Sequence, residues 1–159
     1  MILVSACLAG ETCRYDGRSN LVPAVRALVE AGKAVAVCPE ADGGLPIPRA
    51  PSELQSNRRV VNDQGVDVTA EYERGAALAL AACRANDCSC AILKARSPSC
   101  GKGTVYDGTF SHVCVPGNGI TADLLLKNGV PVFTEDEIQE ALETERLTIK
   151  SQAPKAEKL

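Results

Sequence analysis

The chain begins with MILVSACLAGETCRYDG, residues 1–17, and this stretch indicates how the fold is built. Met1 to Val4 form a short apolar run that is typical of a buried strand, and Cys7 follows shortly after it. Polar residues and a glycine then make Arg14 to Gly17 a tight turn. A strand that ends on a thiol and a turn suggests a site at the strand's carboxyl end, provided that other strands end in the same way.

The same arrangement occurs at two later places in the chain. The apolar run AVAV, 34–37, leads into Cys38 and a proline. The apolar run CAILKA, 90–95, leads into the loop RSPSCG, which contains Cys100. Glycine or proline follows each cysteine within a few residues, so each of these strands is expected to end at a turn.

Helical patterns separate the predicted strands. Asn20 is a typical N-cap for a helix over 21–31, and Thr134 with Glu137 forms the capping-box pattern of the last helix. The expected strands lie at 1–6, 34–37, 90–95 and 130–134, the helices at 21–31, 69–86, 121–128 and 135–144, and irregular segments at 41–68, with one helical turn near Ser52, and at 96–119.

Apolar strands that alternate with helices predict a parallel sheet with right-handed connections. The chain has 159 residues, the length of one ordinary domain. We therefore expect an α/β fold, with a single three-layer domain and a mainly parallel, Rossmann-like sheet over residues 1–145. Residues 146–159 are expected to form a flexible C-terminal tail.

The composition excludes several classes of protein. A net charge of −3 lacks the basic footprint that binds a nucleic-acid polymer, although a single nucleobase is compatible with it. No apolar run approaches the ~20 residues of a membrane span, and no signal peptide is visible at the N-terminus. We expect a soluble cytoplasmic protein, a monomer or small homo-oligomer, that acts on a small molecule.

Eight cysteines are unusual for a chain without an export signal. In a reducing compartment they indicate metal ligation, catalysis or small buried apolar residues. The single histidine, His112, excludes zinc and iron sites built on several histidines, and it has no evident third partner beside Cys114. Aromatic residues are only 3 %, which argues against a broad base-stacking surface. Cys83, Cys88 and Cys90 are expected to be buried filler.

The three strand-end cysteines are the strongest candidates for a site. Open α/β sheets bind ligands at the carboxyl ends of their strands, and Cys7, Cys38 and Cys100 are all expected there. Three thiolates without a partner histidine suit an iron–sulfur cluster better than zinc. A [4Fe–4S] cluster on three cysteines leaves one iron with an open position, which acts as a Lewis acid. The alternative is that these cysteines are small core residues at strand ends.

Three segments that contain these cysteines resemble the signature motifs of the thiouracil desulfurase (TudS-type) family, long known only as a domain of unknown function. The resemblance covers about residues 1–115, in order, and its motifs are specific. The segments are VSACLAGETCRYDG at 4–17, CPEADGGLPIPRAPSE at 38–53 and ILKARSPSCG at 92–101.

The resemblance implies an α/β fold that holds a [4Fe–4S] cluster on three cysteines, and it implies that the fourth iron is left for the sulfur of a thiolated pyrimidine. By position, the implied ligands are Cys7, Cys38 and Cys100 and the implied catalytic pair is Glu40 and Ser97. Cys13 is left out of the ligand set because relatives can lack a cysteine there.

Each polar neighbour has an expected role. Glu40 would deprotonate a water for attack on the carbon that bears sulfur. Either Ser97 or Ser99 would share that water or hold the substrate, and Ser97 is favoured as the catalytic serine. Lys94 supplies positive charge, and Asp16 can accept a hydrogen bond from a ring N–H, so Asp16, Ser99 and Lys94 are the candidates for substrate binding.

These residues lead to one expected activity, the non-redox desulfuration of thiouracil or its nucleoside with release of hydrosulfide. The iron would serve as Lewis acid and as a trap for the leaving sulfur. The alternatives are a structural or sensory iron–sulfur protein without turnover, and a structural zinc domain.

Overall fold

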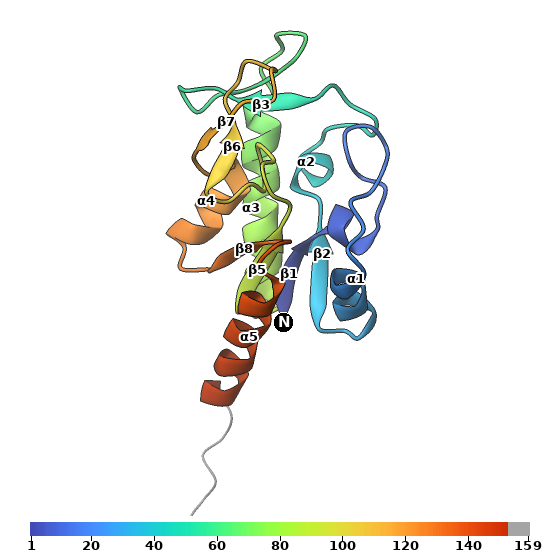
Figure 1. Cartoon of the computed structure of the whole chain (residues 1–159), viewed down its shortest axis with the longest axis vertical. Helices are drawn as coiled ribbons and strands as arrows, with labels where there is room; N and C mark the ends of the chain where they lie inside the picture. Colours follow the sequence, from blue (N-terminus) through green and yellow to red (C-terminus); the bar gives the residue numbers. More distant parts are fainter. Residues whose placement is uncertain (153–159) are drawn as a thin grey trace, which may run out of the picture.

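The computed structural model describes residues 1–152, and a four-stranded sheet lies at its centre (Figure 1). All strand pairs within this sheet are parallel, which confirms the predicted α/β fold. The strand order is β2-β1-β5-β8. The four strands are β1 (Ile2–Ser5), β2 (Ala34–Val37), β5 (Cys90–Leu93) and β8 (Val132–Thr134).

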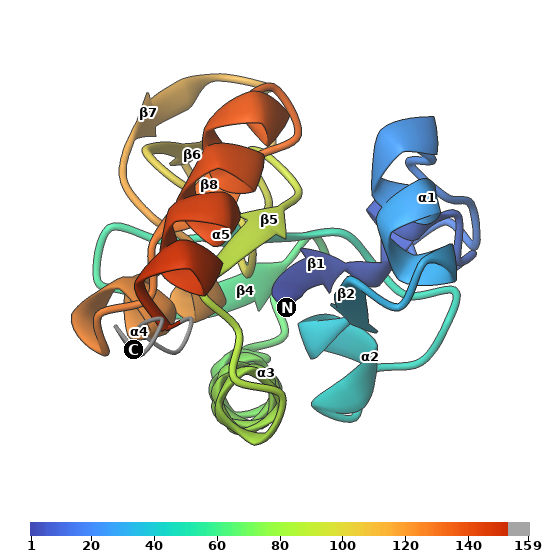
Figure 2. The same ribbon diagram turned by 90° about the horizontal axis from the view of Figure 1, so that it is seen from below.

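Helices cover both faces of this sheet, as Figure 2 shows in a view from below. The helices α1 (Pro23–Glu30) and α5 (Ile138–Gln152) lie on one face. The longest helix, α3 (Thr69–Ala85), lies on the other face together with α4 (Ile120–Lys127). The short helix α2 (Pro39–Asp42) follows β2 on that same face. The protein therefore has three layers, as the sequence predicts.

Side chains of β1 alternate between the two layers of helices. Ile2 and Val4 pack in the same cluster as Val25 of α1 and other apolar residues from that face. Leu3 packs instead in the same cluster as Ala79 of α3 and the apolar residues Ala122 and Leu125 of α4. Because successive side chains of a strand point to opposite faces, the run ILV is buried on both sides of the sheet.

The first helix begins later than predicted. Its N-cap is Val22, without a side-chain cap, and Pro23 occupies the first turn, a position that suits proline. Asn20 is not the cap: its backbone N–H donates to the Cys7 carbonyl at 2.9 Å, and its Oδ1 accepts from Arg14 Nη1 at 3.1 Å. Asn20 therefore binds the turn that carries Cys7.

Two small hairpins replace segments that were expected to be irregular. One pairs β3 (Ser52–Leu54) with β4 (Val60–Asn62), so the helical turn expected near Ser52 is wrong. The other pairs β6 (Thr104–Tyr106) with β7 (Cys114–Pro116). These short strands carry too little periodicity to be read from the sequence, and a small cluster around the fully buried Tyr72 packs them together.

The last helix extends further than expected. Glu137 Oε1 accepts a hydrogen bond from Thr134 N–H at 3.1 Å, which is one half of the predicted capping interaction. The helix α5 then continues to Gln152. The rest of the expected tail, 153–159, lies outside the described residues. In residues 1–152 no helix has the length and apolar character that crossing a membrane requires.

A close contact between backbones fixes α2 against α3. A β-carbon added at Gly75 of α3 would lie 1.8 Å from the carbonyl oxygen of Pro39 in α2. A β-carbon at Gly43, just after α2, would lie 2.1 Å from the Glu71 carbonyl oxygen. Only glycine permits this approach, which positions the α2 residue Glu40.

The substitution Gly75→Ala should therefore destabilise the protein by about 1–3 kcal/mol, because α2 and α3 must separate. In a helix without this contact, the same change would stabilise by roughly 1 kcal/mol. Urea unfolding followed by circular dichroism measures the difference. The exposed Ala81→Ser on the same helix is the matched control, with an expected change within about 0.5 kcal/mol. A Gly75→Ala protein as stable as wild type would contradict the close packing.

Candidate active site

The order of the strands in the sheet changes direction between β1 and β5. From β1 the chain connects to β2 on one side, and later returns to β5 on the other side of β1. The carboxyl ends of β1 and β5 therefore flank a crevice of the kind where open α/β sheets bind ligands. A cavity of about 330 Å³ lies at this edge.

All three strand-end cysteines line that cavity. Cys7 lies in a short 3₁₀ turn, η1 (Ala6–Ala9), directly after β1. Cys38 directly follows β2 and is the N-cap of α2. Cys100 lies in the loop after β5 and is buried. The structure thus brings together residues from three separate segments, as the sequence predicts.

The Cys100 loop owes its shape to Ser97. Ser97 Oγ accepts hydrogen bonds from the N–H groups of Ser99 at 3.1 Å and of Cys100 at 3.0 Å. The Ser97 carbonyl also accepts from Gly101 N–H at 2.8 Å. These bonds close a turn around the cavity-lining hydroxyl of Ser97 and hold the Cys100 thiol in the cavity.

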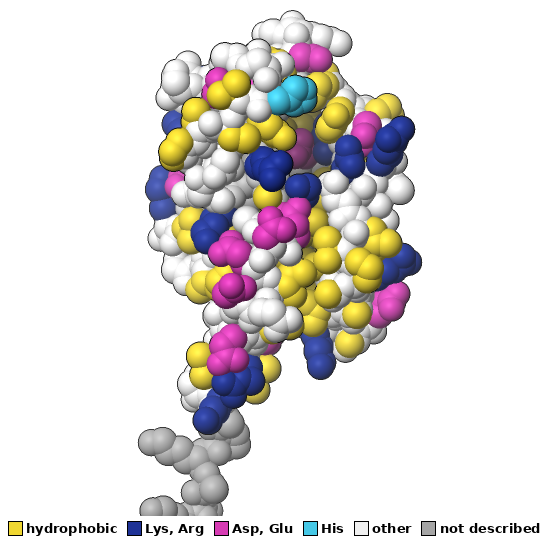
Figure 3. Space-filling model, viewed as in Figure 1, with side chains coloured by type: hydrophobic (Ala, Val, Ile, Leu, Met, Phe, Trp, Pro, Cys, Tyr) yellow, Lys and Arg dark blue, Asp and Glu magenta, His cyan; other side chains and the backbone are white. Residues whose placement is uncertain are grey.

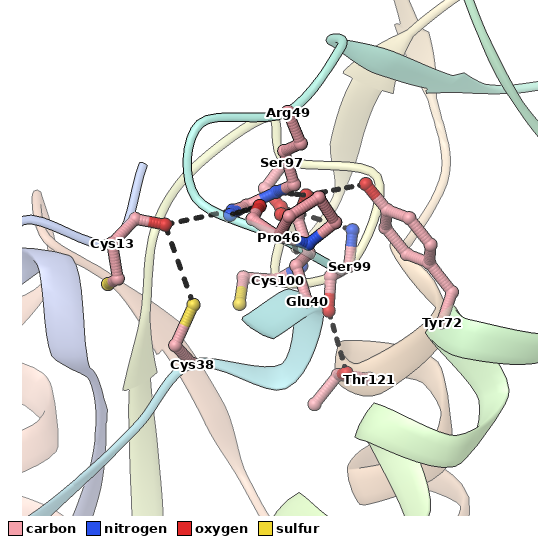
Figure 4. Close-up of polar contacts among 10 residues, drawn as sticks. All are labelled: Cys13, Cys38, Glu40, Pro46, Arg49, Tyr72, Ser97, Ser99, Cys100 and Thr121. Atoms are coloured by element: carbon pink, nitrogen blue, oxygen red, sulfur yellow. Dashed lines mark hydrogen bonds and ion pairs between the residues drawn. The ribbon is translucent and has the colours of Figure 1, made fainter. Parts of the chain in front are cut away.

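A fourth cysteine, Cys13, also lines the cavity. Its backbone carbonyl accepts a hydrogen bond from Arg49 Nη2 at 2.9 Å and from the Cys38 thiol at 3.7 Å (Figure 4). Interaction with the neighbouring Cys13 thiol lowers the pKa of Cys38 to about 7, and interaction with Cys38 raises the pKa of Cys13. Burial raises the pKa of Cys7, and that of Cys100 to about 12. Cys38 is therefore the thiol that ionises most readily.

The carboxylate of Glu40 is held by two donors (Figure 4). Its Oε1 accepts from the Tyr72 hydroxyl at 2.6 Å and from Arg49 Nε at 3.3 Å. The Arg49 side chain is only 6 % exposed, so this ion pair is shielded from water. Burial and the nearby Glu40 charge raise the pKa of Tyr72, which keeps its proton as the donor. Among residues 1–152, Glu40 Oε2 has no polar partner and is free to bind a water or substrate.

The predicted substrate-binding residues are not all at the cavity. Lys94 lines it, and its Nζ pairs with Glu135 Oε2 at 2.8 Å. Ser99 does not: it is fully buried, and its hydroxyl bonds the Thr121 hydroxyl at 2.8 Å. Asp16 also lies outside the lining, where it pairs with Arg14 Nη2 at 2.9 Å. The structure therefore corrects the placement of Ser99 and Asp16.

Aromatic residues are few, yet they gather at this site. Tyr15, Tyr106 and His112 line the cavity, and Tyr72 holds Glu40. These are all three tyrosines and the single histidine of the chain. The rings of Tyr106 and His112 meet edge to face with centroids 6.2 Å apart, and Figure 3 shows the histidine on the surface beside the hollow. The low aromatic content argues against a broad stacking surface, and it is compatible with a few aromatic residues gathered at one cavity.

Two further residues of the site are not predicted from the sequence. Tyr72 lies on α3, and no local pattern links it to Glu40, because only tertiary packing brings the two together. Glu53 lines the cavity from β3, a strand that was not predicted. The remaining cysteines lie elsewhere: Cys83 and Cys90 are buried as expected, Cys88 is half-buried, and Cys114 is exposed.

The chemistry of the donor set fits an iron–sulfur cluster. Four cysteine thiols line the cavity, on separate segments of chain. Cysteine thiolates are the ligands that iron–sulfur clusters use, with each cysteine bound to a different iron.

Fold and site together define an α/β protein with a cysteine-lined pocket at the carboxyl edge of its sheet. Residues 2–137 match the 2-thiouracil desulfurase family, and the chain belongs to that family. The uncharacterized protein YbbK of Bacillus subtilis (strain 168) is 43 % identical over 151 residues, which is 89 % of this chain and 100 % of YbbK.

A solved structure gives the same fold. The [4Fe-4S]-dependent thiouracil desulfidase TudS superposes with a TM-score of 0.87 at 47 % sequence identity. The alignment covers 92 % of this chain and 97 % of the TudS chain. The two chains therefore share the same overall fold.

Proposed function

We propose that the protein is an enzyme that removes sulfur from a thiolated nucleobase, such as thiouracil or its nucleoside, without a redox step. The observation that carries the proposal is the joint placement of three strand-end cysteines and Glu40 around one cavity. Membership of the 2-thiouracil desulfurase family and the likeness to a [4Fe-4S]-dependent thiouracil desulfidase support it.

Cys7, Cys38 and Cys100 would hold a [4Fe–4S] cluster at the bottom of this cavity. Cys7 and Cys38 closely follow their strands, and the turn around Ser97 holds Cys100. Cys13 lies in a longer loop, where its carbonyl accepts from the Cys38 thiol. A cluster bound by three cysteines supplies an iron with an open coordination position, which polarises a thiocarbonyl as a Lewis acid.

Glu40 would act as the general base. Tyr72 and Arg49 occupy its Oε1, so the carboxylate is oriented before substrate binds, and Oε2 is left to take a proton from water. The water oxygen then bonds to the carbon that carries sulfur, and the carbon–sulfur bond breaks. The second proton of the water passes to the sulfur, which leaves as hydrosulfide, and the proton on Glu40 is released to solvent. The oxo base remains, so water supplies every atom added and no electrons are exchanged.

Ser97 would position that water. Its hydroxyl oxygen already accepts two backbone N–H bonds, so its remaining capacity is one O–H donor. This donor can hold the attacking water or an oxygen of the substrate. Ser99 is buried and its hydroxyl bonds the Thr121 hydroxyl, which favours Ser97 as the catalytic serine of the motif.

The walls of the cavity suit a small planar molecule. Tyr15 and Tyr106 offer aromatic surface at its sides, and Lys94 offers a charge that Glu135 already neutralises in part. All eight cysteines are free, which agrees with a reducing, cytoplasmic setting. The protein would act on its small-molecule substrate as a monomer or a small homo-oligomer.

Replacement of a cluster ligand should prevent stable cluster assembly. Anaerobic reconstitution of Cys7→Ser, Cys38→Ser and Cys100→Ser should yield little bound iron, because a serine hydroxyl is a poor substitute for a thiolate. The matched controls are Cys83→Ser and Cys114→Ser, which lie away from the cavity and should keep the wild-type iron content. Full cluster occupancy in the Cys100→Ser protein would refute the ligand assignment.

Glu40→Gln should separate catalysis from cluster binding. The amide keeps the shape of the side chain and an acceptor for Tyr72, but it cannot take a proton from water. Iron content should be unchanged, and hydrosulfide release should fall by on the order of 10²–10⁴. Ser97→Ala should also lower turnover, and its iron content should fall as well, because it removes the acceptor of the Ser99 and Cys100 N–H groups. If Glu40→Gln turns over like wild type at matched iron content, the base is another group.

A further inference from the structure

Two carboxylates, and not one, line the cavity. Glu53, the central residue of β3, is the second. It is only 8 % exposed, and it forms no ion pair with any residue from 1 to 152. A buried carboxylate without a counter-ion is costly, because its charge is removed from water. Such a group needs hydrogen-bond donors to stabilise it.

The protein supplies hydrogen-bond donors to one of the two carboxylate oxygens of Glu53. Glu53 Oε1 accepts from the N–H groups of Gly108 at 3.0 Å and of Phe110 at 3.1 Å. Both donors belong to the turn between β6 and β7, which carries His112 to the cavity. The other oxygen, Oε2, has no polar partner in the part of the chain that the structure describes. Glu53 thus holds the turn with one oxygen and leaves the second free beside the cavity.

A thiolated pyrimidine supplies the missing donor. The carbon that bears sulfur in such a base is bonded to ring nitrogen, and an unsubstituted ring nitrogen carries an N–H. Ser97 cannot accept from this group, because two backbone N–H bonds already fill its acceptor positions. Asp16, the acceptor expected from the sequence, lies outside the cavity lining.

We propose that Glu53 is a substrate-binding residue, whose Oε2 accepts a hydrogen bond from a ring N–H of the thiolated base. This inference rests on the proposed function, since it names a contact within the same site. The contact selects bases that are unsubstituted at that nitrogen, because a methylated base leaves the carboxylate buried without its donor. Glu53 fixes the orientation of the ring and takes no part in bond cleavage.

The test compares N–H with N–CH₃ in two proteins. Glu53→Gln keeps an oxygen for Gly108 and Phe110 but places an NH₂ donor where Oε2 lies, so the turn survives and the substrate contact is lost. The ligands are 2-thiouracil and its 1-methyl and 3-methyl derivatives for turnover, and uracil and its two methyl derivatives for calorimetric binding. Turnover and binding are compared at matched iron content, and the melting temperature of each variant is measured to confirm that it is folded.

In wild type, one of the two methylations should raise KM and weaken binding roughly 10- to 100-fold, the usual value of a hydrogen bond to a charged group. Glu53→Gln should lose as much with the unmethylated base and nothing further on methylation. Gln55→Ala is the matched control: Gln55 Nε2 also holds the turn, through Gly108 O at 3.2 Å, but the residue does not line the cavity. Gln55→Ala should keep the wild-type pattern.

The outcomes separate the two proposals. Equal sensitivity to methylation in wild type and Glu53→Gln would overturn the role of Glu53, because the loss would then be steric. That role would also be overturned if Gln55→Ala reproduces the Glu53→Gln pattern, since the turn alone would explain it. Uracil binding that depends on Glu53, without hydrosulfide release from any thiolated base, would overturn the proposed activity alone. A protein that binds neither uracil nor thiouracil would overturn both.

Discussion

The constraint on which the rest of the structure depends is the meeting of parallel strand ends at one edge of the sheet. β1 pairs with β2 on one side and with β5 on the other, so two hydrogen-bonded ladders hold the carboxyl ends of all three strands side by side. Side chains in the turn or loop that follows each of these strands are brought to the same edge of the sheet. This is how cysteines distant in the sequence line one cavity.

A second constraint orients Glu40, the proposed general base, beside those thiols. Glu40 lies in the first turn of α2, and α2 is fixed by the backbone contact between Pro39 and Gly75 of α3. The same helix α3 supplies Tyr72, whose hydroxyl holds the carboxylate. One helix therefore sets both the position of Glu40 and its orientation, which is the kind of pre-organisation that catalysis needs.

The sequence predicts the sheet and the cysteine edge because both depend on local patterns. The apolar runs, and the cysteines Cys7, Cys38 and Cys100 that follow them, can be recognised from neighbouring residues alone. The contacts of Glu40 with Tyr72 and Arg49 are different in kind, since they join segments that no periodicity connects.

The errors at Glu53 and Ser99 have the same origin. β3 has only three residues, too short to show alternation, and so Glu53 was not expected at the site. Ser99 was expected at the cavity because it neighbours Cys100 in sequence, but a turn directs its side chain into the core, where it meets Thr121. Proximity in sequence does not determine the direction of a side chain in a loop.

The most direct test of the central claim follows the oxygen atom during turnover. Protein reconstituted anaerobically with iron and sulfide is given 2-thiouracil in oxygen-18 water, with no reductant or oxidant. The account predicts one hydrosulfide released for each uracil formed, and uracil that carries the heavy oxygen. A requirement for an electron donor or acceptor, or the absence of hydrosulfide from protein with a complete cluster, would contradict it.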